Sequence, residues 1–316
     1  MISRDREFLI EIARKYYIDG LSQQEIAGLY KISRPTVASL LKRCREERIV
    51  EIRIQESEKS RITSLTESLG SVFPSARIIL IPTENEKIST LISAGRTAAE
   101  LLSSLIMNRM KIGLSWGSSL YQVVKELPLQ DVTGIEVIQL AGSMGMKNTA
   151  YDGFELTREL AKKLNGVSRF IQAPVIVKNP ELKELLIQEH PIKETMRYMS
   201  SLNIAVVGLS SDRPEYSSMV REGFLDADEA DFILSEGGIG HICGLHYDKF
   251  GNFLTIQQNN RVVGINREQL LKIPEVIGIA CGTEKAEAIL GALRGGLIKS
   301  LVTDENTAIE ILNLAE

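Results

Sequence analysis

The sequence predicts an α/β protein with two domains: a small winged helix-turn-helix domain and a larger Rossmann-like domain with a parallel sheet. Residues 1–54 contain three short helical patterns separated by turn residues. Over residues 73–316, short apolar runs alternate with helical patterns, which is typical of a parallel sheet covered by helices. A charged, serine-rich stretch at residues 55–72 is expected to form a linker helix between the two domains.

Charge is divided unevenly along the chain of 316 residues, whose net charge at pH 7 is -4. Residues 1–54 hold eleven Lys and Arg against eight Asp and Glu, which gives +3 there and leaves -7 for the remainder. A basic amino-terminal segment followed by an acidic remainder is expected when only one end of a protein binds phosphate groups. A solvated basic face explains the asymmetry nearly as well.

The cysteines and the hydropathy pattern exclude several classes of protein. Cys44, Cys243 and Cys281 are odd in number and form no CxxC pair, which argues against a disulfide framework or a zinc ribbon. No run approaches the roughly 18 apolar residues of a membrane helix, and the charged start lacks the apolar segment of a signal peptide. We therefore expect a cytoplasmic protein with no membrane partner and no cofactor.

Three helices and a wing are predicted in the first domain. Apolar spacing predicts a first helix at residues 5–18. Ser22 and Glu25 form a capping box for a second helix. Ser33 is expected to cap a third helix, whose first turn accommodates Pro35 because an amide hydrogen there has no helical partner. Residues 49–54 then alternate with a period of two, which predicts a short strand or wing.

The third helix has an apolar face and a polar face, as a DNA-recognition helix does. Two helices joined by a tight turn place the second helix in the major groove, where polar side chains near its start reach base edges and basic ones reach phosphates. A small helical bundle with a solvated basic face is the alternative. The residues expected to contact DNA are Gln23, Ser33, Arg34, Pro35, Thr36, Ser39, Lys42 and Arg43.

Strands and helices of the second domain follow from its hydrophobic pattern. Ligands of open parallel sheets bind beyond the carboxyl ends of the strands, so the loops that follow several strands are expected to converge on one crevice. The predicted strands lie at residues 77–81, 111–114, 134–140, 203–209, 275–280 and 298–303, and the predicted helices at residues 88–107, 152–164 and 284–293.

The loop after the second predicted strand is suited to an anion. Gly113 and Gly117 permit a tight turn, and Ser115, Ser118 and Ser119 place hydroxyl donors at a helix start, where negative charge is favoured. A serine-rich helix cap without a ligand is equally consistent with this loop. Two further loops, at residues 142–148 and 282–285, are expected at the same end of the sheet.

Short motifs are spread along nearly the whole chain. The head contains LSQQEIA at residues 21–27, ISRPTV at 32–37, then LL at 40–41 and IV at 49–50. Downstream lie GLSWGSSL at 113–120, QLAG at 139–142, AP at 173–174, VG at 207–208, GTEK at 282–285 and LVTDE at 301–305. In this order the motifs resemble those of the SorC/DeoR-type sugar-responsive bacterial transcription regulators.

The resemblance implies a DNA-binding repressor of a carbohydrate-utilisation operon. Its effector domain would be similar in fold to glucosamine-phosphate deaminase and ribose-phosphate isomerase. The effector would be a phosphorylated sugar, with Lys285 as a second phosphate ligand by its position in the family pattern. The residues expected to bind the effector are Gly113, Ser115, Trp116, Gly117, Ser118, Ser119, Gly142, Lys147, Asn148, Gly240, His241, Gly282, Thr283 and Lys285.

The sequence departs from the family pattern at three places. His241 stands where an aspartate usually contacts sugar hydroxyls, Ser39 stands where an arginine is common, and Tyr30 and Lys31 replace a turn glycine. The operator sequence and the effector chemistry are therefore expected to differ from those of better-known relatives.

His241, Cys243 and His246 suggest a metal site, but they supply at most three ligands. If residues 242–247 form a strand, His241 and Cys243 share a face while His246 points to the opposite one. We therefore expect no metal and ordinary strand packing.

An enzyme is the alternative class of function, namely a sugar-phosphate isomerase or deaminase fused to a DNA-binding head. Such an enzyme needs a positioned general base. Asp152, Glu155, Glu236 and His241 are available but form no recognisable catalytic pattern, so no enzymatic activity is expected. One recognition helix reads few base pairs, so a homodimer or homotetramer is expected on DNA.

Overall fold

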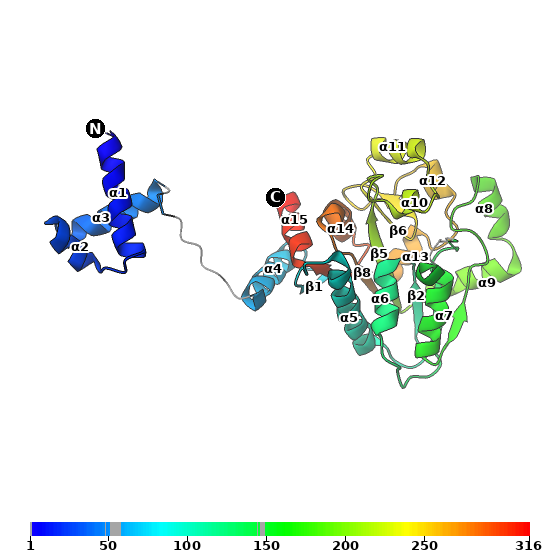
Figure 1. The fold of residues 1–316 in the computed structure, drawn as a ribbon. Helices are drawn as coiled ribbons and strands as arrows, with labels where there is room; N and C mark the ends of the chain where they lie inside the picture. Colours follow the sequence, from blue (N-terminus) through cyan, green and yellow to red (C-terminus); the bar gives the residue numbers. More distant parts are fainter. Residues whose placement is uncertain (1, 48, 51–57, 144, 146–148) are drawn as a thin grey trace. The chain divides into compact units, whose positions relative to one another are not determined.

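The protein is described by a computed structural model covering residues 2–47, 49–50, 58–143, 145 and 149–316. The chain divides into two compact units, Met1–Ser57 and Glu58–Glu316, which we call the amino-terminal unit and the carboxy-terminal unit (Figure 1). The second unit contains a parallel sheet with helices on both faces, which confirms the predicted α/β class.

The elements follow one another along the chain in the order expected for a helical head and an α/β body. The amino-terminal unit contains α1 (Ile2–Tyr17), α2 (Gln23–Tyr30) and α3 (Arg34–Glu46). The strands of the carboxy-terminal unit are β1 (Arg77–Ile81), β2 (Lys111–Leu114), β3 (Glu136–Gln139), β4 (Val167–Arg169), β5 (Ile204–Ser211), β6 (Gly240–Ile242), β7 (Leu245–Tyr247), β8 (Glu275–Ile279) and β9 (Ser300–Asp304). Its helices are α4 (Glu58–Val72), α5 (Lys87–Leu105), α6 (Ser118–Glu126), α7 (Gly153–Lys163), α8 (Pro180–Leu186), α9 (His190–Tyr198), α10 (Ser218–Arg221), α11 (Ala227–Ser235), α12 (Gln257–Asn260), α13 (Arg267–Lys272), α14 (Ala286–Arg294) and α15 (Glu305–Ala315), with short 3₁₀ turns η1 (Thr149–Tyr151), η2 (Met199–Ser201) and η3 (Thr283–Lys285).

The helix starts of the amino-terminal unit confirm the predicted caps. Ser22 Oγ accepts a hydrogen bond from the Glu25 amide, and the Glu25 carboxylate accepts one from the Ser22 amide, so the capping box is complete. Ser33 Oγ accepts from the Thr36 amide, and a proline occupies the first turn of α3. These bonds satisfy amide donors that a helix start otherwise leaves unpaired.

Removal of the Ser22 side chain tests whether the cap stabilises α2. Ser22→Ala is expected to destabilise α2 by about 1 kcal/mol, because the Glu25 amide loses its acceptor. Amide hydrogen exchange of α2 in the full chain measures this change. Ser39→Ala is the control, since an exposed serine inside α3 becomes a better helix former. Equal exchange rates in both variants would contradict the capping role.

The turn between α2 and α3 places a lysine in a conformation that glycine prefers. Lys31, one of the two residues expected to replace a turn glycine, has φ 52° and ends α2 in the left-handed region. This backbone costs a non-glycine residue about 1 kcal/mol. The strand expected at residues 49–54 falls mostly outside the described residues. Ile49 and Val50, which are described, lie outside any strand and pack against Leu9 and Cys44.

Helix α4 differs from the predicted linker. The structure places it in the carboxy-terminal unit, where its Leu69 is fully buried and packs with Phe73 in the core. Arg61 of α4 also forms an ion pair with Glu305 of α15 at 2.5 Å. Ile62, Leu65 and Leu69 recur at helical spacing, so this helix covers the sheet instead of spanning between the units. Residues 55–57 of the predicted linker lie outside the described part of the chain.

The sheet has the strand order β1-β9-β8-β5-β2-β3-β4, and all of these pairings are parallel. All six predicted strands are present. The prediction omitted β4, a three-residue edge strand whose Val167 is exposed and which therefore has little apolar pattern. After β2 the chain continues to β3, which pairs with β2 on the side away from β5. Strand β8 pairs with β5 on the side away from β2. The carboxyl ends of β2 and β5 thus flank a topological switch point, where open α/β sheets bind ligands.

Alternating side chains divide the core into two layers. In β5, Ile204 and Val206 face the layer that contains α5, α6 and α7, whereas Ala205 and Val207 face the layer that contains α4, α14 and α15. This alternation follows from the two-residue period of a strand. Figure 1 shows α5, α6 and α7 side by side in front of the sheet. Within the described residues, no helix is long and apolar enough to cross a membrane.

Residues 240–247 form a hairpin, so the single strand at residues 242–247, on which the opposite orientation of His241 and His246 was conditional, is not present. Cys243 and Gly244 both have positive φ, 52° and 81°, and form a two-residue turn between β6 and β7. Turns of this kind match the twist of antiparallel strands. His241 and His246 are consequently cross-strand partners, not residues on opposite faces of one strand.

Candidate functional site

A cavity of about 500 Å³ lies at the switch point of the sheet. The loop after β2 and the end of β5 contribute to its wall, together with residues from α5, α10, β6 and the loop after β8. Sequence analysis expected a crevice at this end of the sheet because parallel strands deliver their following loops to one edge. The residues that line it are Lys87, Ser115, Trp116, Gly117, Ser118, Ser119, Tyr151, Gly208, Leu209, Ser210, Glu215, Tyr216, Ser218, Arg221, Glu222, His241, Cys243, Glu284 and Lys285.

The loop after β2 supplies polar groups that suit an anion. Gly117 is the N-cap of α6 with φ 115°, and this helix start has no side-chain cap hydrogen bond within the described residues. A Cβ at position 117 would meet no atom within 4 Å, so the space beside this glycine is open. Ser118 and Ser119 begin α6 at the cavity wall. Free first-turn amides and the helix dipole favour negative charge at such a position.

Lys285 brings a positive charge to the same cavity. It is half-buried, and burial lowers its pKa; Glu284 opposes this shift, while Lys87 and Arg221 add to it. Lys87 is paired with Glu284, and Arg221 lies 3.8 Å from a Glu222 oxygen. Within the described part of the chain, Lys285 forms no ion pair. It is therefore a partly desolvated cation with room for an anion beside it.

The structure brings together only some of the residues that the sequence predicted for effector binding. Among them, the cavity is lined by Ser115, Trp116, Gly117, Ser118, Ser119, His241 and Lys285. Gly282 and Thr283 do not line it. The Gly282 amide donates hydrogen bonds to Asp304 and Thr307. Lys147 and Asn148 lie outside the described residues.

Three predicted glycines have packing roles instead of places in the cavity wall. A Cβ at Gly113 would lie 2.5 Å from a Leu140 side-chain carbon, and one at Gly142 would lie 2.4 Å from the Ala173 carbonyl oxygen. A Cβ at Gly240 would lie 2.4 Å from the Ala288 methyl group. These positions need glycine because neighbouring segments approach closely.

Several cavity residues were missed by sequence analysis. Lys87 begins α5, directly after the loop that follows β1, and this place after a strand was a usable signal. Tyr216, Ser218 and Arg221 belong to a segment between β5 and α11 that lacks a clear hydrophobic period. Only the folded chain brings that segment to the cavity.

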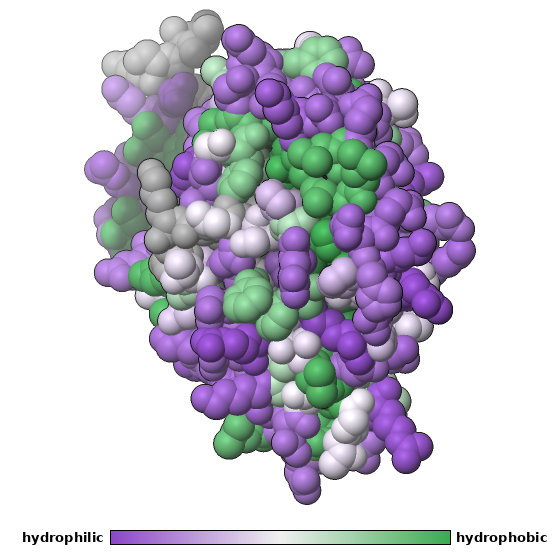
Figure 2. Space-filling model, turned by 90° about the vertical axis from the view of Figure 1, so that its right-hand side faces the viewer, coloured by the Kyte–Doolittle hydropathy of each residue, from purple (hydrophilic) through white to green (hydrophobic). Residues whose placement is uncertain are grey.

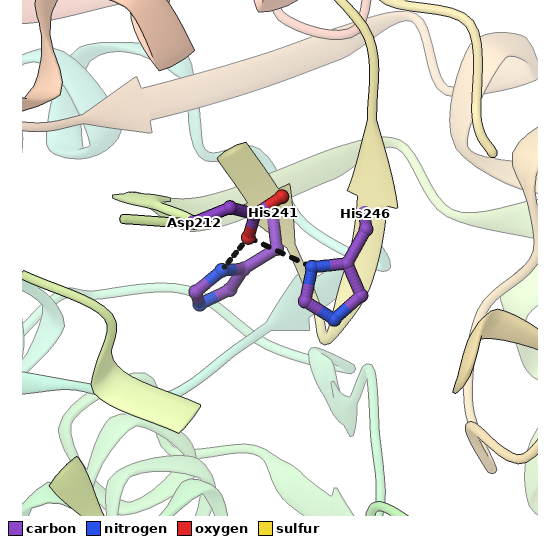
Figure 3. Close-up of side chains that lie close together, drawn as sticks. All are labelled: Asp212, His241 and His246. Atoms are coloured by element: carbon purple, nitrogen blue, oxygen red, sulfur yellow. Dashed lines mark hydrogen bonds and ion pairs between the residues drawn. The ribbon is translucent and has the colours of Figure 1, made fainter. Parts of the chain in front are cut away.

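Asp212, His241 and His246 form a buried cluster beside the cavity (Figure 3). Asp212 Oδ1 lies 2.9 Å from His241 Nδ1 and 2.7 Å from His246 Nδ1. His241 Nε2 lies 3.1 Å from Ser218 Oγ at the cavity wall. The cross-strand pairing of β6 and β7 places both rings on one face, and Asp212 follows β5, which pairs with β6.

The cluster holds a carboxylate that stays ionised. Burial acts to raise the pKa of Asp212, but the two imidazoles, through charge and hydrogen bonds, lower it to about 2. Burial lowers the pKa of His241, and its hydrogen bond to Asp212 only partly opposes this. An ionised carboxylate only accepts hydrogen bonds, so in neutral His241 the proton lies on Nδ1, and Nε2 accepts from Ser218.

Acidification is therefore expected to destabilise the carboxy-terminal unit. The folded state keeps His241 neutral, whereas the unfolded chain protonates it below its ordinary pKa of about 6.5, so stability falls as pH falls below that value. Asp212 adds a second loss between about pH 4 and pH 2. Urea unfolding followed through Trp116 fluorescence between pH 7 and 5 measures the first loss. His241→Gln should reduce the pH dependence and His190→Ala should not; equal slopes in all three proteins would contradict this assignment.

The polar face of α3 is exposed as the recognition-helix interpretation requires. Val37, Leu41 and Cys44 are buried against α1 and α2. The predicted DNA-contacting side chains lie at or near the helix surface, where Ser33, Arg34, Pro35, Thr36, Ser39 and Lys42 are exposed and Gln23 and Arg43 are half-buried. Lys42 and Arg43 also form ion pairs with Glu46 and Glu47, one turn later in α3.

A helix-turn-helix unit joined to an α/β unit with a polar cavity defines a ligand-responsive transcriptional regulator. Residues 57–313 match the family model described as "Putative sugar-binding domain". The chain belongs to this family, within the SorC/DeoR-type transcriptional regulators.

Relatives match over nearly the full length of the chain. The sorbitol operon regulator of Klebsiella pneumoniae is 30% identical over 317 residues, which are 97% of this chain and 98% of that protein. The deoxyribonucleoside regulator of Bacillus subtilis (strain 168) is 28% identical over 319 residues, which are 99% of each chain. The full-length structure of the Klebsiella sorbitol operon regulator superposes with TM-score 0.74 and 29% identity, over 98% of this chain and 99% of that one.

Proposed function

We propose that this protein represses a carbohydrate-utilisation operon and releases operator DNA when a phosphorylated sugar binds in the cavity of the carboxy-terminal unit. The observation that carries this proposal is the position of Lys285. This partly desolvated cation and the uncapped start of α6 line the same cavity. A sugar without an acidic group would leave the lysine without a counter-ion.

The phosphate group would lie against Gly117, Ser118 and Ser119, with Lys285 supplying the charge. Backbone amides, hydroxyls and an ammonium group together form charge-assisted hydrogen bonds to an anion. The sugar hydroxyls would then lie toward His241 and Ser218, which line the same cavity. Gly142, expected to bind the effector, has its close contacts with residues 173 and 174 instead.

DNA recognition would fall to the exposed face of α3. Arg34, Thr36 and Ser39 lie near the start of the helix and suit base edges, while Lys42 and Arg43 suit phosphates. Lys42→Ala is expected to weaken all DNA sequences about equally and to reduce the salt dependence of binding by about one phosphate contact. Ser39 stands where an arginine is common in the family pattern, so the preferred operator should differ from those of better-known relatives.

The experiment that tests the function has two stages. A thermal-shift screen compares pentose, deoxypentose, hexose and hexitol phosphates with the same compounds lacking phosphate. A specific ligand raises the melting temperature by mass action. The hit is then titrated into a complex of the protein with DNA selected from a random-sequence pool. Stabilisation by a phosphorylated sugar and release of DNA support the proposal, and stabilisation only by unphosphorylated sugars contradicts its phosphate part.

The same assay separates a sensor from an enzyme. A regulator should return the sugar phosphate unchanged, whereas an isomerase or deaminase would convert it. Nuclear magnetic resonance of the ligand after overnight incubation reads this directly. Product formation would favour the enzyme hypothesis.

The protein is expected to act as a homodimer or homotetramer on DNA. A single α3 reads few base pairs, and two-fold operators require two-fold proteins. The surface in Figure 2 shows apolar patches interspersed with polar side chains. Exposed apolar residues of the carboxy-terminal unit include Met107, Leu129 and Leu185, and such residues commonly contribute to subunit contacts. Sedimentation should show at least twice the 35.1 kDa chain mass; a monomer both free and on DNA would contradict this prediction.

A further inference from the structure

The cluster of Asp212, His241 and His246 contains two buried polar atoms that the hydrogen bonds of the protein leave unused. Asp212 Oδ2 and His246 Nε2 are buried, and within the described residues neither has a hydrogen-bond partner. All three side chains are 3% exposed or less. Buried polar atoms are normally paired, so this arrangement calls for an explanation.

We propose that Asp212, His241 and His246 form a binding site for a divalent transition metal ion, with Zn²⁺ as the best match. Two imidazoles and one carboxylate are a ligand set that such ions prefer, because imidazole nitrogen and carboxylate oxygen both bind zinc. One potential ligand atom from each residue lies within 4.8 Å of the others. The inference does not depend on the proposed function, since metal binding can be measured without DNA or sugar.

Electrostatics favour a cation at this place. The Asp212 carboxylate is buried, and its Oδ1 lies within hydrogen-bond distance of one nitrogen of each imidazole. A buried anion is costly unless it is paired with positive charge. A divalent ion would neutralise the carboxylate directly. If the carboxylate binds through both oxygens, the unused Oδ2 becomes the fourth donor atom.

The surroundings also support a metal ligand at His241. Metal-binding histidines usually donate their second ring N–H to an acceptor, which fixes the ring. Ser218 Oγ lies 3.1 Å from His241 Nε2 and can fill that role. The present Nδ1 to Oδ1 distances of 2.7 and 2.9 Å are hydrogen-bond distances. Ligands around tetrahedral zinc are separated by roughly 3.3 Å, so metal entry requires the two rings to move outward by about half an ångström.

Metal binding would change the chemistry of the cavity wall. In the metal-free cluster the proton of neutral His241 lies on Nδ1, so Nε2 accepts a hydrogen bond. A metal on Nδ1 forces the proton onto Nε2, which then donates toward Ser218 and the cavity. The metal would thereby convert His241 from an acceptor to a donor at the sugar side of the cavity.

Nitrogen resonances of the imidazoles test the proposal without any substitution. The chain contains three histidines, His190, His241 and His246, so their ¹⁵N signals can be assigned. The chelator-treated full-length protein is titrated with ZnCl₂ alone. We expect one zinc ion per chain, with the proton of His241 moving from Nδ1 to Nε2 and one ring nitrogen of His246 shifting on zinc binding, while exposed His190 is unchanged.

Variants give an independent measurement by calorimetry and elemental analysis. His246→Gln and Asp212→Asn should each weaken zinc binding by about a hundred-fold or more, and Ser218→Ala by about ten-fold, because outer partners contribute less than ligands. His190→Ala is the matched control and should bind zinc as the unchanged protein does. Absence of stoichiometric zinc, or zinc binding that is lost only in the His190 variant, would overturn the proposal.

Discussion

Lys285→Ala is expected to weaken the effector response by about ten- to a hundred-fold. Loss of one hydrogen bond to a charged group costs roughly 1.5 to 3 kcal/mol, which corresponds to that range of affinity. DNA affinity without effector should remain nearly intact, because Lys285 lies in the carboxy-terminal unit and the proposed DNA contacts lie in the other. Release of DNA against the concentration of the sugar phosphate found by the screen gives the midpoint to compare.

Gly117→Val should have a larger effect on the same measurement. The side chain would occupy the open space beside the start of α6, and position 117 has φ 115°, which valine tolerates poorly. Gly237→Val separates strain from blockage, since Gly237 has φ 85° and similarly open space but does not line the cavity. Lys272→Ala, which changes an exposed side chain of α13, controls for loss of a positive charge. Unchanged midpoints in both cavity variants would require the effector site to be placed elsewhere.

Removal of residues 1–57 is expected to abolish specific DNA binding. The remaining chain keeps the sheet, both core layers and the complete cavity wall, so it should still be stabilised by the same sugar phosphate. Specific binding exceeds non-specific binding by about a thousand-fold or more, and at least that factor should be lost. Fluorescence anisotropy on the selected DNA measures this loss, and the thermal shift with ligand shows that the shortened chain is folded. Full DNA affinity of residues 58–316 would disprove the assignment of DNA binding to the amino-terminal unit.

Local signals in the sequence predicted the framework with good accuracy. Ser22 with Glu25, and Ser33 with Pro35, define the starts of α2 and α3 through contacts within one turn. The bounds predicted for β1 and β2 agree with the structure, because short apolar runs between polar turns are read directly from the chain. The loop from Ser115 to Ser119 and Lys285 were placed at one cavity for the same reason, since each follows a parallel strand.

Errors arose where a conformation depends on distant contacts. Residues 240–247 carry no Asn-Gly or Asp-Gly signal, so the turn at Cys243, which adopts φ 52°, was not visible in the pattern. One part of the argument against a metal site, that His246 points away from His241, depended on an extended strand and does not hold in the hairpin. The helix at residues 58–72 was expected to be a linker because its apolar residues form only a weak amphipathic pattern. The packing of Leu69 in the core is visible only in the structure.

The sequence by itself determined the two-part architecture, the helix caps, the order of the strands along the chain and the place of the loop from Ser115 to Ser119 at the cavity. All of these depend on interactions between residues close in sequence. Only the tertiary structure decided that Asp212 meets His241 and His246, which are 29 and 34 positions away, and that Lys87 and Arg221 lie near Lys285. Side-chain periodicity records which face of an element is buried, but it carries no information about which distant element covers that face.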